Sequence, residues 1–196
     1  MKTLTVTVLT LALLAPAPAL LAAGKDAKET PGKTKQEAKA DEKRKAIDDI
    51  AAKTLDRMTT ASGIAKSELD KAVGYAVFDN TKVAIGISGG GGRGVAVDKA
   101  TGARTYMKMG TVGVGFGLGG QSYQVVFLFE TKDALTSFIE KGWQADAQAT
   151  AAAGTEGANA ESTFKNGVAV YQFTEAGLMA NADISGTKYW KNEKLD

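Results

Sequence analysis

The chain of 196 residues contains neither cysteine nor histidine. Without cysteine it has no disulfide, no thiolate metal ligand and no cysteine nucleophile. Without histidine it lacks the side chain that most often serves as a general base or zinc ligand near neutral pH. These two absences exclude serine–histidine catalysis and ordinary zinc sites.

The chain also lacks a large excess of either positive or negative charge. Lys and Arg number 24 against 22 Asp and Glu, which gives a formal net charge of +2. No basic excess points to a nucleic-acid partner, because domains that bind nucleic acid carry clustered positive charge. We therefore expect no nucleic-acid partner.

Residues 1–23 have the pattern of a secretory signal peptide. Lys2 supplies a positive start, and the apolar run Leu4–Leu14 is too short to span a bilayer and ends before two prolines. A membrane anchor retained in the mature protein is the less favoured alternative. Because an oxidising compartment makes stray thiols a liability, a cysteine-free exported chain fits the bacterial periplasm, and a peripheral place on a membrane is compatible with it.

Residues 24–40 are rich in lysine and poor in apolar side chains, which predicts a disordered linker. It is interpreted as a solvated spacer rather than a weak basic tether to lipid. From Asp41 to Thr60 apolar residues recur at helical spacing, and this amphipathic helix is expected to pack on the domain rather than on a membrane. A second helix is predicted to begin at Ser67 and to end at Gly74.

The middle of the chain predicts strands joined in hairpins. Asp79–Lys82 has turn chemistry for a first hairpin, and Lys99–Gly102 for a second. A strand at Ser122–Phe129 has almost no charge, as expected of a strand buried on both faces. The remaining predicted strands are Tyr75–Phe78, Val83–Ile87, Gly94–Asp98, Ala103–Met109, Thr111–Leu118, Val168–Phe173 and Leu178–Ile184.

Thr131 is predicted to cap a helix that runs to Lys141 and stops at Gly142, and residues 144–154 are rich in alanine and permit a further helix. Helices first and strands afterwards predict an α+β fold. We expect N-terminal helices, then a glycine-rich, mainly antiparallel β-sheet or partly closed barrel with an inserted helical region. Residues 41–196 would form this single domain.

More than half of the 23 glycines lie between Gly86 and Gly120. In Gly113–Gly119 they alternate with apolar residues, so a strand here would have one apolar face and one of nearly bare backbone. Such a strand suits a bend or the close approach of another backbone. Two strings match a dinucleotide fingerprint, but a strand, not a helix, is predicted to follow each, so no nucleotide site is expected.

The run Gly89–Gly94 presents backbone N–H groups without side-chain hindrance beside the guanidinium of Arg93. This chemistry suits a phosphate or another anionic group. A bulged hairpin with a merely solvated arginine explains the same residues equally well.

Acidic residues stand at the ends of several predicted strands, where catalytic groups are often placed. No second partner lies at a readable spacing from any of them, so we expect no enzyme activity, no cofactor and no metal. The four acids are Asp79, Asp98, Glu130 and Asp183.

Several segments together resemble the SYLF domain family, which occurs in exported bacterial proteins and in eukaryotic proteins that link phosphoinositide membranes to actin. The resemblance covers Ile47 to Tyr189 and rests on the order and spacing of motifs that are weak one by one. They are Lys71–Phe78 (KAVGYAVF), Ile85–Val95 (IGISGGGGRGV), Gly113–Ser122 (GVGFGLGGQS), Ala134–Phe138 (ALTSF), Val170-Tyr171, Gly177-Leu178 and Tyr189.

The resemblance implies non-enzymatic binding of membrane phospholipids, with anionic or phosphoinositide-like head groups. Arg93 with neighbouring backbone amides would contact the head group. The alternative is an envelope structural or protein-interaction module whose glycine-rich sheet face docks a protein partner. The full set of candidate lipid-binding residues is Arg93, Gly91, Gly92, Lys82, Arg104 and Lys108.

Overall fold

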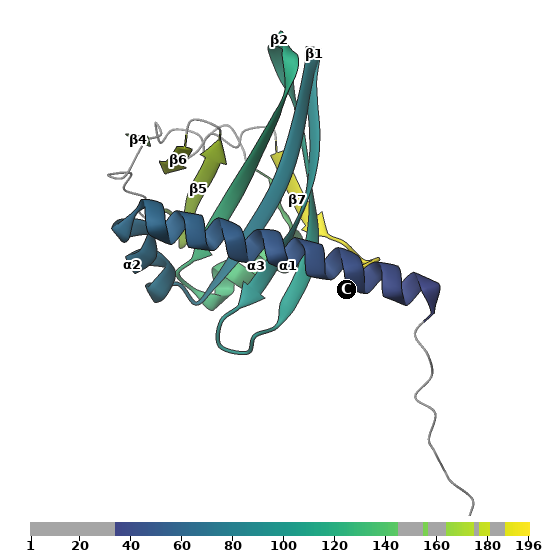
Figure 1. The fold of residues 1–196 in the computed structure, drawn as a ribbon. Helices are drawn as coiled ribbons and strands as arrows, with labels where there is room; N and C mark the ends of the chain where they lie inside the picture. Colours follow the sequence, from purple (N-terminus) through teal and green to yellow (C-terminus); the bar gives the residue numbers. More distant parts are fainter. Residues whose placement is uncertain (1–33, 145–154, 157–163, 175–176, 181–186) are drawn as a thin grey trace, which may run out of the picture. The chain divides into compact units, whose positions relative to one another are not determined.

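A computed structural model describes residues 34–144, 155–156, 164–174, 177–180 and 187–196. The expected signal peptide, most of the expected linker and nearly all of the alanine-rich stretch 144–154 lie outside the described residues. The described part has N-terminal helices followed by an antiparallel sheet with an inserted helix (Figure 1). The expected α+β fold is confirmed. No helix among the described residues is long and apolar enough to cross a bilayer.

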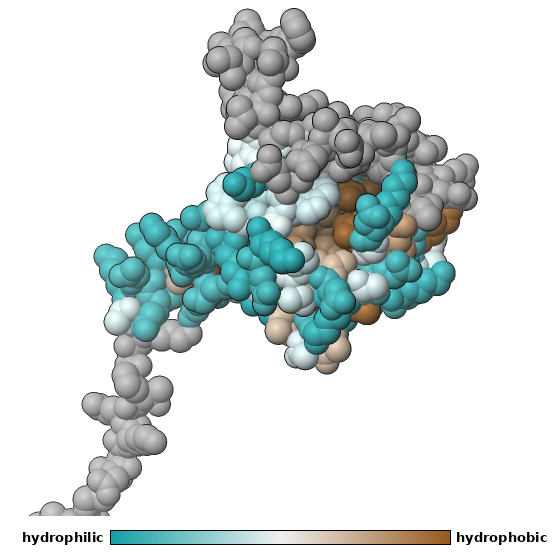
Figure 2. All heavy atoms as spheres, turned by 180° about the vertical axis from the view of Figure 1, so that it is seen from behind, coloured by the Kyte–Doolittle hydropathy of each residue, from teal (hydrophilic) through white to brown (hydrophobic). Residues whose placement is uncertain are grey.

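Helix α1 (Lys35–Ala61) begins before the residue predicted from periodicity, within the segment expected to be a disordered linker. A capping box explains the earlier start. The Thr34 hydroxyl accepts a hydrogen bond of 3.2 Å from the Glu37 N–H, and the Glu37 carboxylate accepts one of 2.7 Å from the Thr34 N–H. The end of α1 that this box caps is hydrophilic on the face seen in Figure 2.

Helix α2 (Gly63–Lys71) is capped by Ser62, whose hydroxyl accepts a hydrogen bond of 3.2 Å from the Ala65 N–H. The predicted cap, Ser67, was wrong because it lies inside this helix. A serine three residues before an acid is a weak signal, and the competing serine directly follows α1, where the chain must turn.

Strands β1 (Gly74–Asp98) and β2 (Arg104–Phe129) pair along their whole length as one hairpin. The predicted turn at Lys99–Gly102 is confirmed. The turn predicted at Asp79–Lys82 is wrong, because β1 continues through it. There Asn80 pairs with Tyr123 across the hairpin and is 1 % exposed.

Both strands of the hairpin bend, and the two halves of β1 lie side by side near their base. The bend coincides with a register shift between Ile85 and Ile87. A Cβ atom on Gly94 would meet the Val77 carbonyl oxygen and the Phe78 ring, so only glycine allows this approach of two backbones. The bend expected in Gly113–Gly119 is thus seen, whereas the close approach of backbones is at Gly94, in the other glycine run.

The remaining strands flank the two halves of β2. The C-terminal half pairs with β5 (Val168–Thr174), and β6 (Gly177–Ala180) and β4 (Thr155–Glu156) follow outward. The N-terminal half pairs with β7 (Thr187–Lys191), which in turn pairs with β3 (Trp143–Gln144). The sheet is antiparallel, bent and not closed.

One face of the sheet is covered by α1 and α2. Ile47, Ala51 and Met58 of α1 are buried there, so α1 packs on the domain as expected from its pattern. The buried residues of the sheet in this cluster include Val77, Val95, Val126, Leu128 and Tyr171.

The other face carries an aromatic core closed by α3 (Lys132–Lys141). The predicted Thr131 cap is confirmed by a hydrogen bond of 3.2 Å from the Ala134 N–H, and Gly142 ends the helix with φ +69°. Ring centroids lie 4.7 to 6.4 Å apart in this core, which favours edge-to-face and tilted pairs. Its rings are Phe78, Phe127, Phe129, Phe138, Trp143 and Tyr189.

Candidate functional site

Basic side chains meet on the α1-side face of the sheet, where three strands run next to one another. Arg93 on β1 lies directly opposite Lys108 on β2, and Lys108 lies opposite Trp190 on β7. Because paired residues of a sheet share a face, and i and i+2 do so along a strand, Lys188 lies on this face as well. We call Arg93, Lys108 and Lys188 the basic row.

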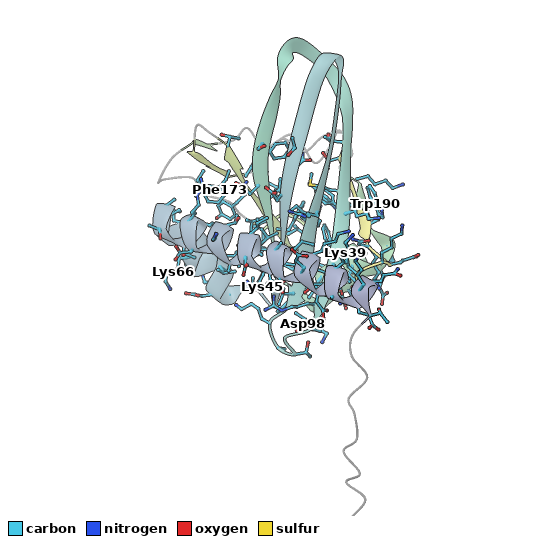
Figure 3. All side chains as sticks on the ribbon, turned by 45° about the vertical axis from the view of Figure 1, so that its right-hand side comes forward. Lys39, Lys45, Lys66, Asp98, Phe173 and Trp190 are labelled. Carbon is cyan, nitrogen blue, oxygen red and sulfur yellow. The ribbon has the colours of Figure 1, made fainter. Side chains whose placement is uncertain are left out.

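Trp190 stands beside the basic row and is the large apolar side chain that the described surface leaves most open, at 40 % exposure (Figure 3). A Cβ atom on Gly110 would lie 3.2 Å from the Trp190 ring, so the indole covers the bare backbone of β2. Gly110 pairs with Gly91 on one side and with Lys188 on the other. A flat, partly exposed tryptophan thus borders three cations.

The basic row is not neutralised by neighbouring acids. Arg93 and Lys188 are exposed, Lys108 is half-buried, and none of the three forms an ion pair with any residue that the structure describes. Like charges placed opposite one another on a sheet are unfavourable, as Arg93 and Lys108 are here. An anion bound between them would relieve this repulsion.

Arg104, also predicted as a lipid contact, precedes Lys108 on β2 and lies beside the hairpin turn, opposite Val97. Its guanidinium donates a hydrogen bond of 2.9 Å to Asp48 on α1. The Tyr106 hydroxyl donates to the same carboxylate at 3.1 Å, and burial together with this bond raises the pKa of Tyr106. The structure therefore places Arg104 in a contact between α1 and the sheet, apart from the basic row.

The other predicted residues lie on β1. Lys82 pairs with Gln121, on the half of the hairpin that leads away from the basic row. Gly91 and Gly92 lie in the strand, not in an exposed turn, and pair with Gly110 and Met109. The backbone groups of Gly91 and Gly92 that face β2 take part in the β1–β2 ladder. In the described part of the chain β1 pairs with β2 alone, and its own two halves approach each other near the base, where a Cβ atom on Gly92 would meet the Asp79 carbonyl oxygen.

Sequence reasoning did not single out Lys188 and Trp190. The segment Thr187–Lys191 is short and has two adjacent aromatic residues between lysines, so its strand pattern was weak, although Tyr189 was recognised through the resemblance. Its burial alternates as a strand requires, with Thr187 and Tyr189 buried and Lys188 and Trp190 exposed. The sequence signal that could have identified β7 is its content of β-forming residues, threonine, tyrosine and tryptophan.

Two of the four strand-end acids have structural partners. Asp79 accepts a hydrogen bond of 3.0 Å from the Gln124 amide, and Asp98 accepts bonds from backbone N–H groups in the hairpin turn. Glu130 is exposed, and Asp183 lies outside the described residues. Among the residues described, no three acids lie close enough together to hold a metal ion.

A hollow of about 320 Å³ lies between the C-terminal end of α1 and the β5–β6 hairpin. The Arg57 guanidinium lies 4.8 Å from the centroid of the Phe173 ring, a cation–π contact on its wall. Arg57 also reaches the Gln124 side chain at 3.4 Å. Its charge is thus engaged by the protein itself.

The chain is similar in sequence to known proteins. The family described as Ysc84, Las17-binding protein actin regulator, matches residues 110–196. A protein of Aeromonas veronii named Beta cell expansion factor A is 42% identical over 156 residues, which are 80% of this chain and 60% of that protein. The chain thus spans about 60% of the length of the curated relative it matches. Through residues 110–196, this chain belongs to the Ysc84 (SYLF) domain family.

Proposed function

We propose that this SYLF domain binds membrane surfaces rich in anionic phospholipid and catalyses no reaction there. The observation that carries the proposal is the basic row: three cations on adjacent strands, without an ion-pair partner in the described structure. We propose further that the chain is exported and works at a membrane surface in the periplasm, on the basis of its N-terminal sequence. N-terminal sequencing of the protein recovered from its compartment tests the export.

The chemistry of the row suits a phosphate diester. Arg93 can donate two parallel hydrogen bonds to phosphate oxygens, whereas Lys108 and Lys188 contribute point charges. Backbone N–H groups at the exposed Gly89 and Gly91 would add single bonds to the same head group. Trp190 would lie at the boundary between head groups and acyl chains, where its amphipathic ring is favoured.

Vesicle flotation tests the proposal with two compositions, phosphatidylcholine alone and phosphatidylcholine mixed with phosphatidylglycerol. We expect binding to the anionic vesicles, and we expect salt to weaken it. Each cation near an anionic surface contributes about 1 kcal/mol, so Arg93→Ala should weaken binding about fivefold. Arg104→Ala removes the same charge beside the hairpin turn, where Arg104 pairs with Asp48, and is the matched control.

Equal binding to both compositions, or binding to neither, would contradict a head-group site. Equal effects of Arg93→Ala and Arg104→Ala would show that net charge matters and the basic row does not. Circular dichroism and thermal unfolding of both variants establish that each retains the fold.

A second candidate function is the docking of a protein partner. It is favoured by the glycine-rich stretch of β2 around Gly115, because bare backbone allows the close approach of another chain. A pull-down from envelope extracts distinguishes the two. Capture of a partner that Gly115→Val abolishes while the fold is retained would favour the docking module.

A further inference from the structure

The β1–β2 hairpin extends beyond the strands that flank it (Figure 1). Strand β7 pairs with β2 only as far as Thr111, and β5 pairs with it only from Gln124 onward. Between these two points β2 is paired with β1 alone, as far as the described residues show. The bent end of the hairpin therefore projects from the body of the domain.

This projecting end has no charged residue. On β1 no charge occurs between Lys82 and Arg93, and on β2 none occurs between Lys108 and Glu130. We call residues 83–92 and 112–120 the hairpin tip. It consists of glycine, valine, isoleucine, alanine, phenylalanine, leucine and serine. A projecting segment of this composition is unfavourable in water and marks a surface that another phase or molecule covers.

The basic row lies at the base of the tip. Arg93 and Lys108 are the residues at which the uncharged runs of the two strands begin or end, and Trp190 lies across from Lys108. The hairpin turn with Asp98 is at the opposite end (Figure 3). The uncharged tip lies above the basic row and Trp190. This arrangement is complementary to an anionic bilayer, whose apolar interior lies beneath charged head groups.

We propose that the hairpin tip enters the interfacial region of one leaflet of an anionic bilayer while the basic row contacts the head groups. This inference rests on the proposed lipid binding and adds to it an inserting element and an orientation. The hairpin turn at Asp98 then points away from the membrane.

The length of the hairpin tip limits how deeply it can enter the bilayer. The stretch Val83–Gly86 reaches about 13 Å and the stretch Ile87–Gly92 about 20 Å at about 3.3 Å per residue. The whole hydrocarbon core is about 30 Å thick, so the tip cannot cross it. Backbone groups on the open strand edges have no partner in hydrocarbon, which holds the tip near the ester groups where water remains.

Because the chain has no cysteine, single-cysteine labels can test the inference directly in the full protein. An environment-sensitive fluorophore is attached to Phe116→Cys in the tip or to Thr101→Cys in the hairpin turn. With phosphatidylcholine–phosphatidylglycerol vesicles we expect a blue shift for the tip label and none for the turn label. Spin-labelled lipids should quench the tip label, a head-group label more strongly than a label at the chain end.

The outcomes separate insertion from lipid binding. If both labels behave alike while the vesicles still float the protein, insertion is wrong and lipid binding stands. If neither variant floats, although both are folded and the unlabelled protein also fails to float, the proposed function is wrong. Stronger quenching from the chain end than from the head group would overturn the interfacial depth.

A charge placed in the tip gives an independent test. Val114→Asp puts a carboxylate in the tip, and Thr101→Asp puts the same charge in the turn, so both variants have the same net charge. We expect Val114→Asp to lose flotation and Thr101→Asp to retain it. Equal flotation of the two would overturn insertion, provided that thermal unfolding shows both to be folded.

Discussion

The Tyr171 hydroxyl on β5 donates a hydrogen bond of 2.7 Å to the Glu68 carboxylate on α2. This bond joins the second helix to the sheet across the buried face under α1. Burial raises the pKa of Glu68, while the bond from Tyr171 and the charge of Lys71 act in the opposite direction. The tyrosine thus favours the ionised carboxylate in a site that disfavours it.

Replacing Tyr171 by phenylalanine should lower the free energy of unfolding by about 1 kcal/mol near neutral pH, because a hydrogen bond to a half-buried carboxylate is lost. The loss should shrink as the pH falls and Glu68 becomes protonated, since an uncharged carboxyl is a weaker acceptor. Urea unfolding at several pH values measures both effects.

Tyr189→Phe is the matched control. Its hydroxyl is fully buried and has no hydrogen-bond partner among the described residues, so its removal should be neutral or stabilising. Equal destabilisation by the two substitutions would show that ring packing, rather than the bond to Glu68, accounts for the effect.

Asp98 gives the domain a pH-dependent contact. Burial acts to raise the pKa of Asp98, but it is outweighed by bonds from the N–H groups of Ala100 and Thr101 and by Lys132 at 3.3 Å, so the pKa is lowered. A lowered pKa stabilises the fold above the unfolded value of 3.8, and this contribution is lost as the pH falls through the folded value.

Asp98→Asn keeps an acceptor oxygen for the turn but removes the charge. We expect the variant to melt below the wild type near neutral pH and the difference to diminish on acidification below about pH 3.8. Differential scanning calorimetry across this range measures it. A difference that is constant with pH would mean that the carboxylate charge plays no part.

Gly94 marks the place where the two halves of β1 meet. Gly94→Ala would force the new methyl group against the Val77 carbonyl oxygen and the Phe78 ring, and we expect a loss of about 3 kcal/mol or more. Nothing lies within 4 Å of a Cβ atom built on Gly89, so Gly89→Ala should be tolerated within about 0.5 kcal/mol. Chemical denaturation of both variants tests the difference between two glycines of one run.

Asp48 accepts hydrogen bonds from Arg104 and Tyr106. Substituting Asp48 should therefore lower the free energy of unfolding more than substituting Arg104 does. Arg104→Ala should cost at most about 1 kcal/mol, because the pair is exposed (46% and 29% for the two side chains) and screened. Asp48→Ala also leaves the buried Tyr106 hydroxyl without this acceptor and should cost more. Chemical denaturation of the two single variants measures both losses of unfolding free energy, and equal losses would contradict this ranking.

Local signals in the sequence were sufficient where local chemistry decides the structure. The cap and stop of α3, at Thr131 and Gly142, and the turn at Lys99–Gly102 were predicted because their hydrogen bonds connect near neighbours. Asp79–Lys82 carries similar turn residues, but backbone pairing with Gln121–Gln124 of β2 holds it in a strand. That pairing comes from distant residues, so the turn chemistry alone was misleading.

The candidate site was predictable in part for the same reason. Arg93 was recognised beside its glycines, and Lys108 was included among the candidates. Lys188 and Trp190 join them only because β7 returns to β2 across a long stretch of sequence. Arg104 was grouped with the others by charge, and only the position of α1 shows that it has another partner.

The register shift at the bend has a consequence for length variation. Ile85 pairs with Leu118 and Ile87 with Val114, so Gly115, Phe116 and Gly117 face Gly86 alone, an excess of two residues on β2. An even excess preserves the alternation of the two faces, so Met107 and Met109 of one half share the aromatic-core face with Phe127 and Phe129 of the other. Loss of a single residue here would invert one half of the strand, whereas loss of two would only shorten the bend.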